Sequence, residues 1–312
     1  MLTGNILITG SGFLAGAIVK RAVDEKWNCK ITIYSRDPIK HHKMQVQYPQ
    51  CKYIVGDICD LNGLSKAFIG HDIVFHTAAL KHIPECEANP EETMRVNYGG
   101  TCNIARAALE AKVDKVVLIS TDKAAHPINI YGVSKLAAER LFQKYSSYGL
   151  TNYHTVRYGN ILGSTGSVLT VWRKMLERDG FVTATLPNMS RFWMTVEQAV
   201  DTILLSLSEP HSTITIPKVK ALDMATFAEY TMPDARFEYS GLRPGEKLHE
   251  ELVTIEEVLF FHNETGSHFR IYPTTRTAPM FGVMLGEFVR EKGYRSDNCD
   301  QLTRDELLEM LK

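Results

Sequence analysis

The first half of the chain alternates short β-rich runs with longer helical patterns, and this alternation limits the possible folds more than any other feature. The runs expected to form strands are Asn5–Thr9, Lys30–Ser35, Tyr53–Val55, Ile73–His76, Lys115–Ser120 and His154–Arg157. The segments expected to form helices between them are Leu14–Glu25, Leu61–Ile69, Pro90–Ala111 and Tyr131–Tyr148. Consecutive β-α-β units favour right-handed crossovers and a parallel sheet covered on both faces. The sequence therefore predicts an α/β fold with a doubly wound parallel sheet, which binds ligands beyond the carboxyl ends of its strands.

The alternation stops after Gly159, where the expected elements become shorter and loops more frequent. Arg243-Pro244-Gly245 interrupts this second half. We expect a nucleotide-binding domain of the Rossmann type over residues 1–160. Residues 161–312 are expected to form mostly a smaller C-terminal substrate-binding lobe, with some segments returning to the first domain.

The composition excludes several classes of protein. The chain has 312 residues, of which 44% are hydrophobic and 23% charged, and its formal net charge is -1. Such a charge gives no general attraction to nucleic acid or to an anionic membrane. No apolar run reaches the roughly 18 residues of a spanning helix, and the six cysteines are scattered without metal-ligand spacing. We expect a cytoplasmic protein with reduced thiols, no metal site, and neither a nucleic-acid nor a membrane partner.

A glycine-rich turn with the sequence GSGFLAG, residues 10–16, follows the first expected strand. Gly10 would permit a tight turn, and Gly12 would let backbone amides approach a pyrophosphate at the start of the next helix. Ala15 or Gly16 would allow the helix to pack closely on the strand. Because the turn lies at the first β-α junction, it predicts a dinucleotide site. Its residues are Gly10, Ser11, Gly12, Phe13 and Leu14.

Two further strand ends bear on the identity of the dinucleotide. Ser35 and Arg36 follow the second strand with a hydroxyl and a guanidinium, which would pair with a 2'-phosphate, whereas NAD sites usually offer a carboxylate there. This favours NADP, although Arg36 could instead be solvated beside Asp37. Asp57 and Ile58 follow the third strand, where the carboxylate could accept from an adenine amine or simply close an Asx turn.

A group of reactive side chains lies within fifteen residues of one another, namely Thr121, Asp122, Lys123, Tyr131 and Lys135. Tyr131 and Lys135 share a helix face because they are four residues apart. A nearby ammonium, together with an oxidised nicotinamide ring, would lower the pKa of the phenol from its usual value of about 10 and make it a base. The alternative is that Asp122 and Lys123 form an ordinary ion pair on the surface.

With these residues in place, the chain resembles the extended short-chain dehydrogenase/reductases. More narrowly, it resembles the inverting UDP-N-acetylglucosamine 4,6-dehydratases of the polysaccharide-biosynthesis group. The matching segments run in family order: Tyr34–Asp37, His76–Lys81, Thr121–Ala124, Pro127–Tyr131, Arg157–Asn160, Ser190–Trp193 and Leu242–Glu250. The last segment and the Thr-Asp-Lys triplet are the specific ones, because the glycine turn and the YxxxK pattern occur far more widely.

The resemblance implies a role for each reactive side chain. Tyr131 would take the proton of the sugar 4-hydroxyl while hydride passes to NADP, with Lys135 beside it. Lys123 would remove the proton from carbon 5, and Asp122 would protonate the hydroxyl that leaves carbon 6. Thr121 would donate a hydrogen bond to the carbonyl oxygen. A lysine base needs a pKa below its usual value of about 10.4, and an aspartic acid needs one above about 3.9. Nearby cations favour the first change and oppose the second, so the acid role of Asp122 requires burial or a shared proton.

The resemblance also implies which residues contact the ligands. The further cofactor contacts would be Ala78, Ala79, Lys81, Asn97 and Tyr158. The contacts with the UDP-sugar substrate would be Lys81, His82, Asn160, Ser167, Val168, Arg191, Lys218, Arg243 and Glu246. Glu246 would orient either Arg243 or the ribose. Each charged residue has a surface salt bridge as its alternative, Arg191 could instead stack on Phe192-Trp193, and His82 could be structural.

The chain departs from the family pattern in three places. The glycine turn reads GxGxxxG, one residue shorter than usual, and His126 stands where Asn is more common. The apolar stretch of residues 278–289, where the resemblance is weaker, could be a core helix or an oligomer contact. After it, Tyr294–Asn298 and a short terminal helix again resemble the end of the family sequences. By analogy we expect a homo-oligomer, either a dimer or a hexamer.

Three alternatives to an inverting dehydratase stay open. A UDP-sugar 4-epimerase or a retaining 4,6-dehydratase would use the same cofactor site. A non-catalytic NADP-binding regulator would have kept the fold without the reaction. Within the resemblance, Lys123 argues against the dTDP-glucose dehydratases, which carry Glu there, and Tyr131 argues against the relatives that carry Met in place of the tyrosine.

Overall fold

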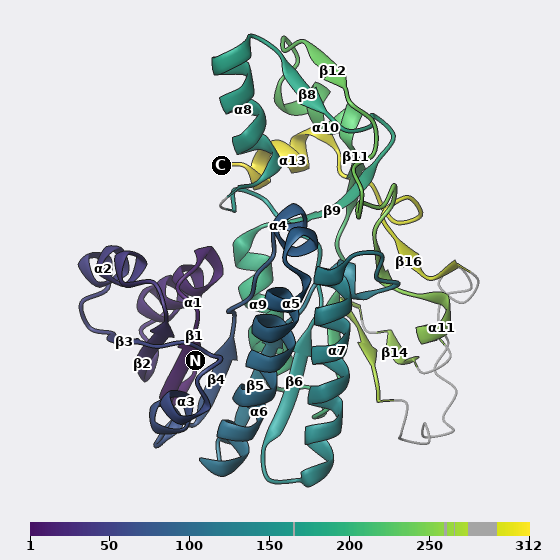
Figure 1. The fold of residues 1–312 in the computed structure, drawn as a ribbon. Coiled ribbons are helices and arrows are strands. Elements are labelled where there is room, and N and C mark those ends of the chain that lie inside the picture. The colour runs from purple at the N-terminus through teal and green to yellow at the C-terminus, as the bar shows by residue number, and fades with distance from the viewer. Residues whose placement is uncertain (165, 259–260, 265, 274–291) are drawn as a thin grey trace.

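A nine-stranded sheet lies at the centre of the described part of the chain, which comprises residues 1–164, 166–258, 261–264, 266–273 and 292–312 of a computed structural model (Figure 1). Its order is β14-β15-β10-β6-β5-β4-β1-β2-β3, parallel from β10 to β3 and antiparallel at β15 and β14. The strands are β1 (Thr3–Thr9), β2 (Asn28–Ser35), β3 (Lys52–Val55), β4 (Ile73–His76), β5 (Lys115–Ile119), β6 (Asn152–Val156), β10 (Ile214–Pro217), β14 (Phe261–Glu264) and β15 (His268–Ile271). The expected doubly wound fold is confirmed.

Helices cover both faces of this sheet. One face carries α1 (Phe13–Asp24), α2 (Pro38–Gln47) and α9 (Val196–Ser206), and the other carries α3 (Leu61–Phe68), α6 (Gly100–Glu110) and α7 (Ile130–Tyr145). Because both faces are covered, Ile6, Leu7 and Ile8 of β1 are all fully buried. From β1 the sheet is built outward through β2 and β3 on one side, and from β4 it is built outward through β5 and β6 on the other side. A ligand crevice is expected at the carboxyl ends of β1 and β4, where the direction of building reverses.

A second lobe lies over one end of the sheet (Figure 1). It contains three small sheets, β7-β9-β11, β8-β12 and β13-β16. Their strands are β7 (Asn160–Ile161), β8 (Val182–Ala184), β9 (Ser190–Met194), β11 (Ala221–Asp223), β12 (Phe237–Tyr239), β13 (Glu251–Val253) and β16 (Tyr294–Arg295), and the helices are α8 (Val168–Asp179), α10 (Met224–Thr231) and α13 (Arg304–Met310). Helix α11 (Ile255–Val258) lies beside β14 and packs on the core of the large sheet (Figure 1). Since β6 ends at Val156 and β7 starts at Asn160, the lobe begins at the carboxyl end of the sheet.

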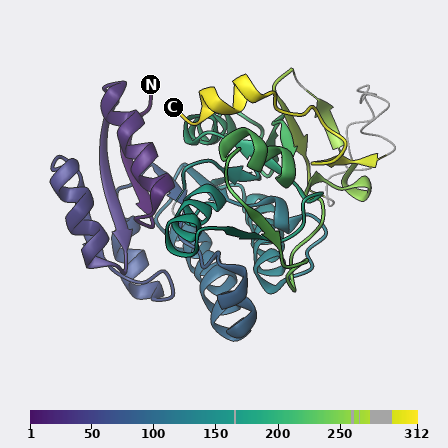
Figure 2. The same ribbon diagram turned by 90° about the horizontal axis from the view of Figure 1, so that it is seen from above.

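The lobe has its own apolar core, built around aromatic side chains. Trp193 stacks on Phe227 with 4.5 Å between ring centroids, and Trp172 meets the same ring edge-on at 5.9 Å. Seen from above, the N-terminal strands and helices lie on one side and the C-terminal segments on the other (Figure 2). Three strands of the second half, β10, β14 and β15, belong to the large sheet. The proposed boundary near residue 160 stays a prediction.

The sequence missed several local features. It did not predict α2, whose sequence PIKHHKMQVQ is polar and buries only His41 and Met44, or the six-residue α4 (Ile83–Ala88). The helix expected over Pro90–Ala111 is divided into α5 (Pro90–Met94), a π-helical turn (Arg95–Gly99) and α6. The apolar stretch of residues 278–289 lies outside the described residues.

Three further features concern membrane-spanning helices, the cysteines and the end of the chain. No helix among the described residues is long and apolar enough to cross a membrane. The six cysteines form no disulfide. The expected terminal helix is present as α13, and it begins with a capping box in which Thr303 and Glu306 bond each other's backbone amides.

Candidate active site

The turn between β1 and α1 has the geometry that a dinucleotide requires. Gly10 has a φ of +104°, and a Cβ there would lie 2.6 Å from Thr77 Oγ1, so only glycine fits. Gly12 caps α1, and a Cβ there would meet nothing within 4 Å. That open side faces the exposed helix N-terminus, where backbone N–H groups can receive a pyrophosphate. Ala15, which is fully buried, makes the close packing contact, whereas Gly16 has open space around it.

The end of β2 carries a chain of hydrogen bonds behind the expected 2'-phosphate position. Ser35 Oγ donates to Ser11 Oγ at 2.8 Å and lies 2.7 Å from Nε2 of the buried His41. Burial lowers the pKa of His41, so its ring is neutral at pH 7. Arg36 is exposed and forms no ion pair within the described part of the chain, so its guanidinium is available to a phosphate.

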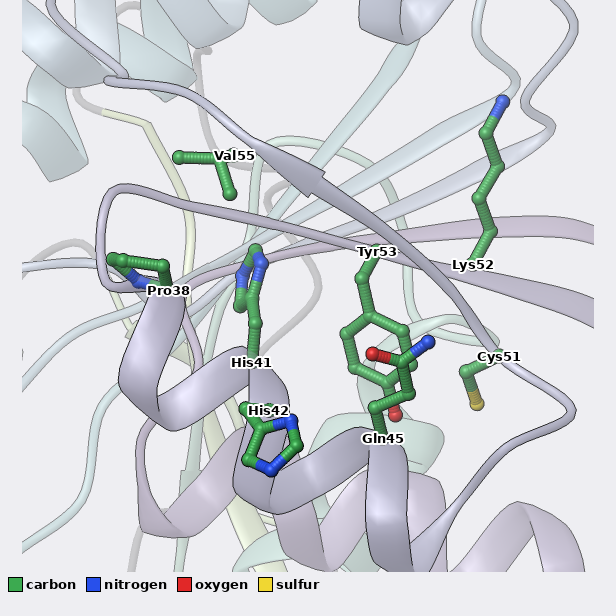
Figure 3. A pocket seen from close by; sticks show the side chains of 8 residues that line it. All are labelled: Pro38, His41, His42, Gln45, Cys51, Lys52, Tyr53 and Val55. Carbon is green, nitrogen blue, oxygen red and sulfur yellow. The ribbon is translucent and has the colours of Figure 1, made fainter.

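His41 belongs to α2 and was not predicted as part of the site. Figure 3 shows it in the wall of a hollow of about 430 Å³ between α2 and β3. This hollow lies at the outer edge of the sheet and contains none of the expected catalytic residues. A run of ten mostly polar residues gave no sign that one histidine turns inward to contact Ser35.

Two expected cofactor residues have structural contacts of their own. Asp57 Oδ1 accepts from the backbone N–H of Cys59 at 2.9 Å, so the Asx turn considered above is present, and Ile58 is buried beside Gly100. A second carboxylate oxygen of Asp57 is still able to accept from an adenine amine.

Asn97 lies in the π-helical turn and supports the segment that follows β4. Its Oδ1 accepts from Leu80 N at 2.8 Å, while its Nδ2 donates to Leu80 O at 2.9 Å and to Ser134 Oγ at 3.0 Å. These bonds tie the segment of Ala78, Ala79 and Lys81 to α7. Such π-helical turns often occur at functional sites. Asn97 therefore positions the expected cofactor loop from behind.

Helix α7 brings Tyr131 and Lys135 up to the Thr-Asp-Lys triplet. Asn129 caps the helix by accepting from Gly132 N at 2.7 Å, and a Cβ on Gly132 would lie only 2.2 Å from Lys123 O. Glycine at that position thus allows the close approach. Burial lowers the pKa of Lys135 to about 8, although Glu139 opposes this change. Burial also raises the pKa of Tyr131 to about 12, which Lys123 partly offsets, so the phenol is protonated in the protein alone.

Asp122 and Lys123 form a buried ion pair with a second carboxylate, so the surface alternative is wrong. Lys123 Nζ lies 3.0 Å from Asp122 Oδ1 and 3.1 Å from Glu250 Oε1. The Lys123 side chain is 18% exposed and that of Asp122 1%. Thr121 Oγ1 donates to Asp122 Oδ1 at 2.9 Å, which occupies the hydroxyl hydrogen expected to reach the substrate. Glu250 stands in the matching segment Leu242–Glu250 but was not predicted as a site residue.

These contacts shift the pKa values of Lys123 and Asp122. Burial disfavours the charge on Lys123, but Asp122 and Glu250 outweigh it and hold the pKa of the lysine above its usual value. Burial, assisted by Glu250 and opposed by Lys123, raises the pKa of Asp122. The expected lowering of the lysine pKa by nearby cations is therefore not found in the unliganded protein, whereas the expected rise for Asp122 is.

A cavity of about 240 Å³ in the second lobe gathers most of the expected substrate residues. Those that line it are Asn160, Val168, Arg191, Arg243 and Glu246, together with apolar side chains such as Trp172 and Met175. His82 lies near its rim, because a Cβ on Gly166 would be 3.5 Å from His82 Cε1. Lys81 and Ser167 do not line the cavity. Lys218 does not either, since its Nζ lies 5.3 Å from the ring centroid of Phe269.

The polar residues of the cavity differ in how firmly they are held. Arg191 Nη1 donates to Ser190 O at 2.7 Å and to Leu248 O at 3.2 Å, which fixes the guanidinium by backbone contacts. Glu246 Oε2 is buried and has no hydrogen-bond partner among the described residues, and no ion pair joins it to Arg243 there. Of the two roles expected for Glu246, contact with a ribose hydroxyl is therefore the better supported.

His126, which follows the Thr-Asp-Lys triplet closely in the chain, contacts β13 and α11. Its ring nitrogens lie 2.6 Å from Glu251 Oε2 and 2.6 Å from Glu256 Oε2, and its φ is +42°. Asparagine adopts this left-handed conformation more readily than most residues, which gives a physical reason for the usual Asn at this position. No cluster of potential metal ligands occurs among the described residues.

The chain is similar to known proteins over most of its length. The sequence profile of a family described as "Polysaccharide biosynthesis protein" matches residues 6–272. The chain is 33% identical to a UDP-N-acetylglucosamine 4,6-dehydratase (inverting) of Campylobacter jejuni, over 98% of this chain and 97% of that protein. It is also 32% identical to a UDP-glucose 4-epimerase of Rickettsia bellii, over 98% and 94% respectively. Among solved structures, Pen from Bacillus thuringiensis superposes with a TM-score of 0.88 at 31% identity, over 99% of this chain and 97% of that one.

Proposed function

Since the chain belongs to the polysaccharide biosynthesis protein family, we propose that it is an NADP-dependent lyase acting on UDP-N-acetylglucosamine. The product would be a UDP-4-keto-6-deoxy-N-acetylhexosamine with inverted configuration at carbon 5, used to build surface glycans. The observation that carries this proposal is the buried pair of Asp122 and Lys123. It offers one group able to give a proton and one able to take a proton at the carboxyl end of the sheet.

The residues at the ends of β1 and β2 fit a bound NADP. The open side of Gly12 leaves room for the pyrophosphate at the helix N-terminus. Ser11, Ser35 and Arg36 would hold the 2'-phosphate, because a guanidinium and hydroxyls pair with phosphate oxygens. When bound, the cofactor would supply a temporary acceptor for the hydride of carbon 4.

The protein side chains would then handle the protons. Tyr131 would first lose its phenolic proton to solvent, when the oxidised cofactor and the cationic Lys135 on the same helix face lower its pKa, and the phenolate would then accept the proton of the 4-hydroxyl. A ketone at carbon 4 makes the hydrogen on carbon 5 acidic, and Lys123 would remove it after losing its own surplus proton. Asp122, whose pKa is raised by burial, would give a proton to the hydroxyl that leaves carbon 6 as water.

The cavity of the second lobe would hold the UDP group. Arg191 and Arg243 would pair with the diphosphate, because planar guanidinium groups bind phosphate oxygens with two hydrogen bonds. The unpartnered Glu246 Oε2 would accept from the ribose, and Asn160 would contact a phosphate. The apolar side chains beside them would cover one face of the uracil ring.

The test is to incubate the purified protein with NADP and UDP-N-acetylglucosamine and to weigh the product by mass spectrometry. A dehydratase gives a product lighter by one water. A UDP-sugar 4-epimerase, the alternative favoured by the likeness to the Rickettsia protein, gives a product of unchanged mass. Absence of turnover across a panel of UDP-sugars, with cofactor binding intact, would support a regulator instead.

The remaining expectations concern the state of the protein in the cell. A cytoplasmic location and a homo-oligomer, either a dimer or a hexamer, stay predictions. Ile128 and Val133, exposed at and near the start of α7, are consistent with a contact between copies at this helix. Size-exclusion chromatography with light scattering would measure the number of subunits.

A further inference from the structure

Glu250 is fixed next to the catalytic lysine although nothing in the sequence pattern gave it a role. It directly precedes β13, its side chain is 2% exposed, and its backbone N–H donates to Ser296 Oγ at 2.9 Å. Its Oε1 lies 3.1 Å from Lys123 Nζ and 3.8 Å from Arg191 Nε. Its Oε2 is buried without a hydrogen-bond partner among the described residues. A buried carboxylate in this position must affect the charge of Lys123.

The two carboxylates leave one direction open at the lysine nitrogen. Nζ has three positions besides its bond to carbon, and two of them face Asp122 Oδ1 and Glu250 Oε1. The third position holds either the surplus proton of an ammonium or the lone pair of an amine. Glu250 therefore limits rotation of the amine and directs the third position away from both carboxylates.

The contacts of Asp122 indicate where its proton belongs. Thr121 Oγ1 and Lys123 Nζ both donate to Oδ1, at 2.9 Å and 3.0 Å. Oδ2 is buried and has no partner among the described residues. It lies beside Gly159, where a Cβ would be 3.4 Å away. A proton on Oδ2 would leave Oδ1 free to accept from both donors.

Charges divide unequally between the two acids. Burial favours the neutral form of each, and for Asp122 the negative Glu250 adds to this effect, so the pKa of Asp122 is raised. For Glu250 the cations Lys123 and Arg191 outweigh burial, so its pKa is lowered. Of the two acids, Asp122 is therefore the one that takes a proton more readily, and Glu250 is the one that stays a carboxylate beside the Lys123 ammonium.

We propose that Glu250 is the counter-ion of Lys123 and the acceptor of its surplus proton, and that it thereby leaves Asp122 free to stay protonated as the acid. The inference rests on the proposed dehydratase reaction. Glu250 touches Lys123 rather than the substrate, and it is a positioning residue in this sense. The reaction needs a protonated Asp122 and a neutral Lys123, but an isolated pair of these two residues would favour an ionised acid and a protonated base. A second carboxylate at Glu250 removes this conflict.

The proton transfers balance. As the substrate excludes water, the proton of Lys123 that faces Glu250 Oε1 passes to it, which turns an ion pair into a neutral amine and a carboxylic acid. The amine then turns about its Cε–Nζ bond, so that its lone pair takes the third position. The C5–H bond breaks, its proton goes to this lone pair, and its electron pair forms the bond between carbons 5 and 6. The C6–O bond breaks as the proton of Asp122 joins the leaving oxygen to form water. After Lys123 gives a proton back to carbon 5, Glu250 returns its proton to Lys123, and the proton that Tyr131 took from the 4-hydroxyl restores Asp122.

The first test is the pH profile of dehydration in Glu250→Gln, which keeps an oxygen near Lys123 but removes the charge and the proton acceptor. We expect a rate lower by about 10²-fold or more, within the usual range for acid-base groups. Asp122 would then be the only counter-ion of Lys123, so its pKa would fall and the loss of rate at high pH would begin at least about one pH unit lower. Glu250→Asp should restore part of the rate. The control Glu251→Gln changes the adjacent carboxylate, which bonds His126 instead, and should leave the profile unchanged.

The second test needs no turnover. Infrared spectra of protein with ¹³C-labelled aspartate should show a protonated carboxyl band at neutral pH that disappears in Asp122→Asn and also in Glu250→Gln. A band that persists in Glu250→Gln, or an unshifted pH profile, would overturn the proposal even if the enzyme dehydrates UDP-N-acetylglucosamine. If the wild-type protein dehydrated no UDP-sugar, the proposed function would fail, while the infrared result would still decide whether Glu250 keeps Asp122 protonated.

Discussion

Two buried clusters in this protein each place one cation between two carboxylates, yet they differ in how completely their hydrogen bonds are made. The first, called here the Arg157 cluster, joins Arg157 to Glu139 of α7 and Glu257 of α11. The second, the Lys123 cluster, joins Lys123 to Asp122 and Glu250. They lie on adjoining parts of the chain, since Glu250 and Glu257 are seven residues apart.

Every donor of the Arg157 cluster is used. Nε donates to Glu139, Nη1 donates to Glu257 and to Leu252 O, and Nη2 donates to both carboxylates, all between 2.6 and 3.0 Å. Glu139 also accepts from Ser120 Oγ at 2.5 Å. A guanidinium has five N–H groups, so none is left over. This cluster holds α7, β6 and α11 together and has no capacity for a substrate.

The Lys123 cluster is incomplete by comparison. Asp122 Oδ2 and Glu250 Oε2 are both buried, and neither has a partner among the described residues. Unsatisfied buried polar groups are rare in proteins and costly, and they mark sites that await a ligand or exchange protons. The comparison separates an ion cluster whose hydrogen-bonding capacity is filled from one that has two buried oxygens left over, and the second fits the chemical role proposed for it.

Arg157→Met should have the largest effect, because it leaves two buried carboxylates without their cation. We expect the free energy of unfolding to fall by about 3–5 kcal/mol, and activity to be lost with the fold. Chemical denaturation followed by circular dichroism measures this. A loss below about 1 kcal/mol would contradict the structural role given to the cluster.

Lys123→Met should separate activity from stability. Dehydration should fall by about 10²- to 10⁴-fold, as expected when a catalytic base is removed. Burial raises the pKa of Asp122, so this acid can be neutral without the lysine, and Arg191 Nε, 3.8 Å from Glu250 Oε1, remains as a cation for the second carboxylate. We therefore expect the free energy of unfolding to change by less than about 2 kcal/mol. Denaturation curves and initial rates on the same preparation decide this. An equally large loss of stability in both variants would erase the distinction between the clusters.

The two clusters should respond to opposite changes of pH: raising the pH should reduce the dehydration rate through the Lys123 cluster, and lowering the pH should reduce the stability that the Arg157 cluster provides. Asp122 must be protonated, so dehydration should fall about tenfold per unit as pH rises above its raised pKa. Burial opposes the charge of Glu257 but Arg157 outweighs it and lowers its pKa. Its contribution to stability is therefore present above the usual glutamate pKa of about 4.3 and is lost as pH falls through the lowered value. Rates and denaturation midpoints measured across pH would show whether both losses occur at the same end.

The smallest effect should come from Arg36→Ala, which extends the comparison to an exposed arginine with no partner in the described chain. Loss of one guanidinium contact should reduce the preference for NADP over NAD by about tenfold, since exposed charge pairs contribute only about 1 kcal/mol. Lys40→Ala on the same surface, paired with Asp37, is the control. The ratio of the two dissociation constants from fluorescence titration measures the change, and an unaltered ratio would assign the phosphate to other residues.

What the sequence could predict depended on how local the physical cause was. Six strands of the parallel sheet and the turn at Gly10 follow from short runs of residues and are present, whereas β10 was not predicted. Glu250 as a partner of Lys123 and Glu257 as a partner of Arg157 could not be predicted in this way, because each lies about a hundred residues or more along the chain from its cation. Only the fold brings them together.

Other omissions have the same origin. Helix α2 carries few apolar residues, so its amphipathic pattern was too weak to predict it, and with it His41 behind Ser35 was missed. The position of Lys218 over Phe269 depends on β10 pairing with β15, a long-range contact that no motif encodes.

The most direct test of the account is the hydrogen that arrives at carbon 5. Wild-type and Lys123→Met proteins, both shown to be folded, would be incubated with NADP and UDP-N-acetylglucosamine in heavy water, and the products analysed by mass spectrometry and NMR. We predict a wild-type product that lacks one water and carries deuterium at carbon 5, and no such product from Lys123→Met. A dehydrated, deuterated product formed by the variant at a near-normal rate would contradict the assignment of Lys123, and with it the chemical role of its cluster.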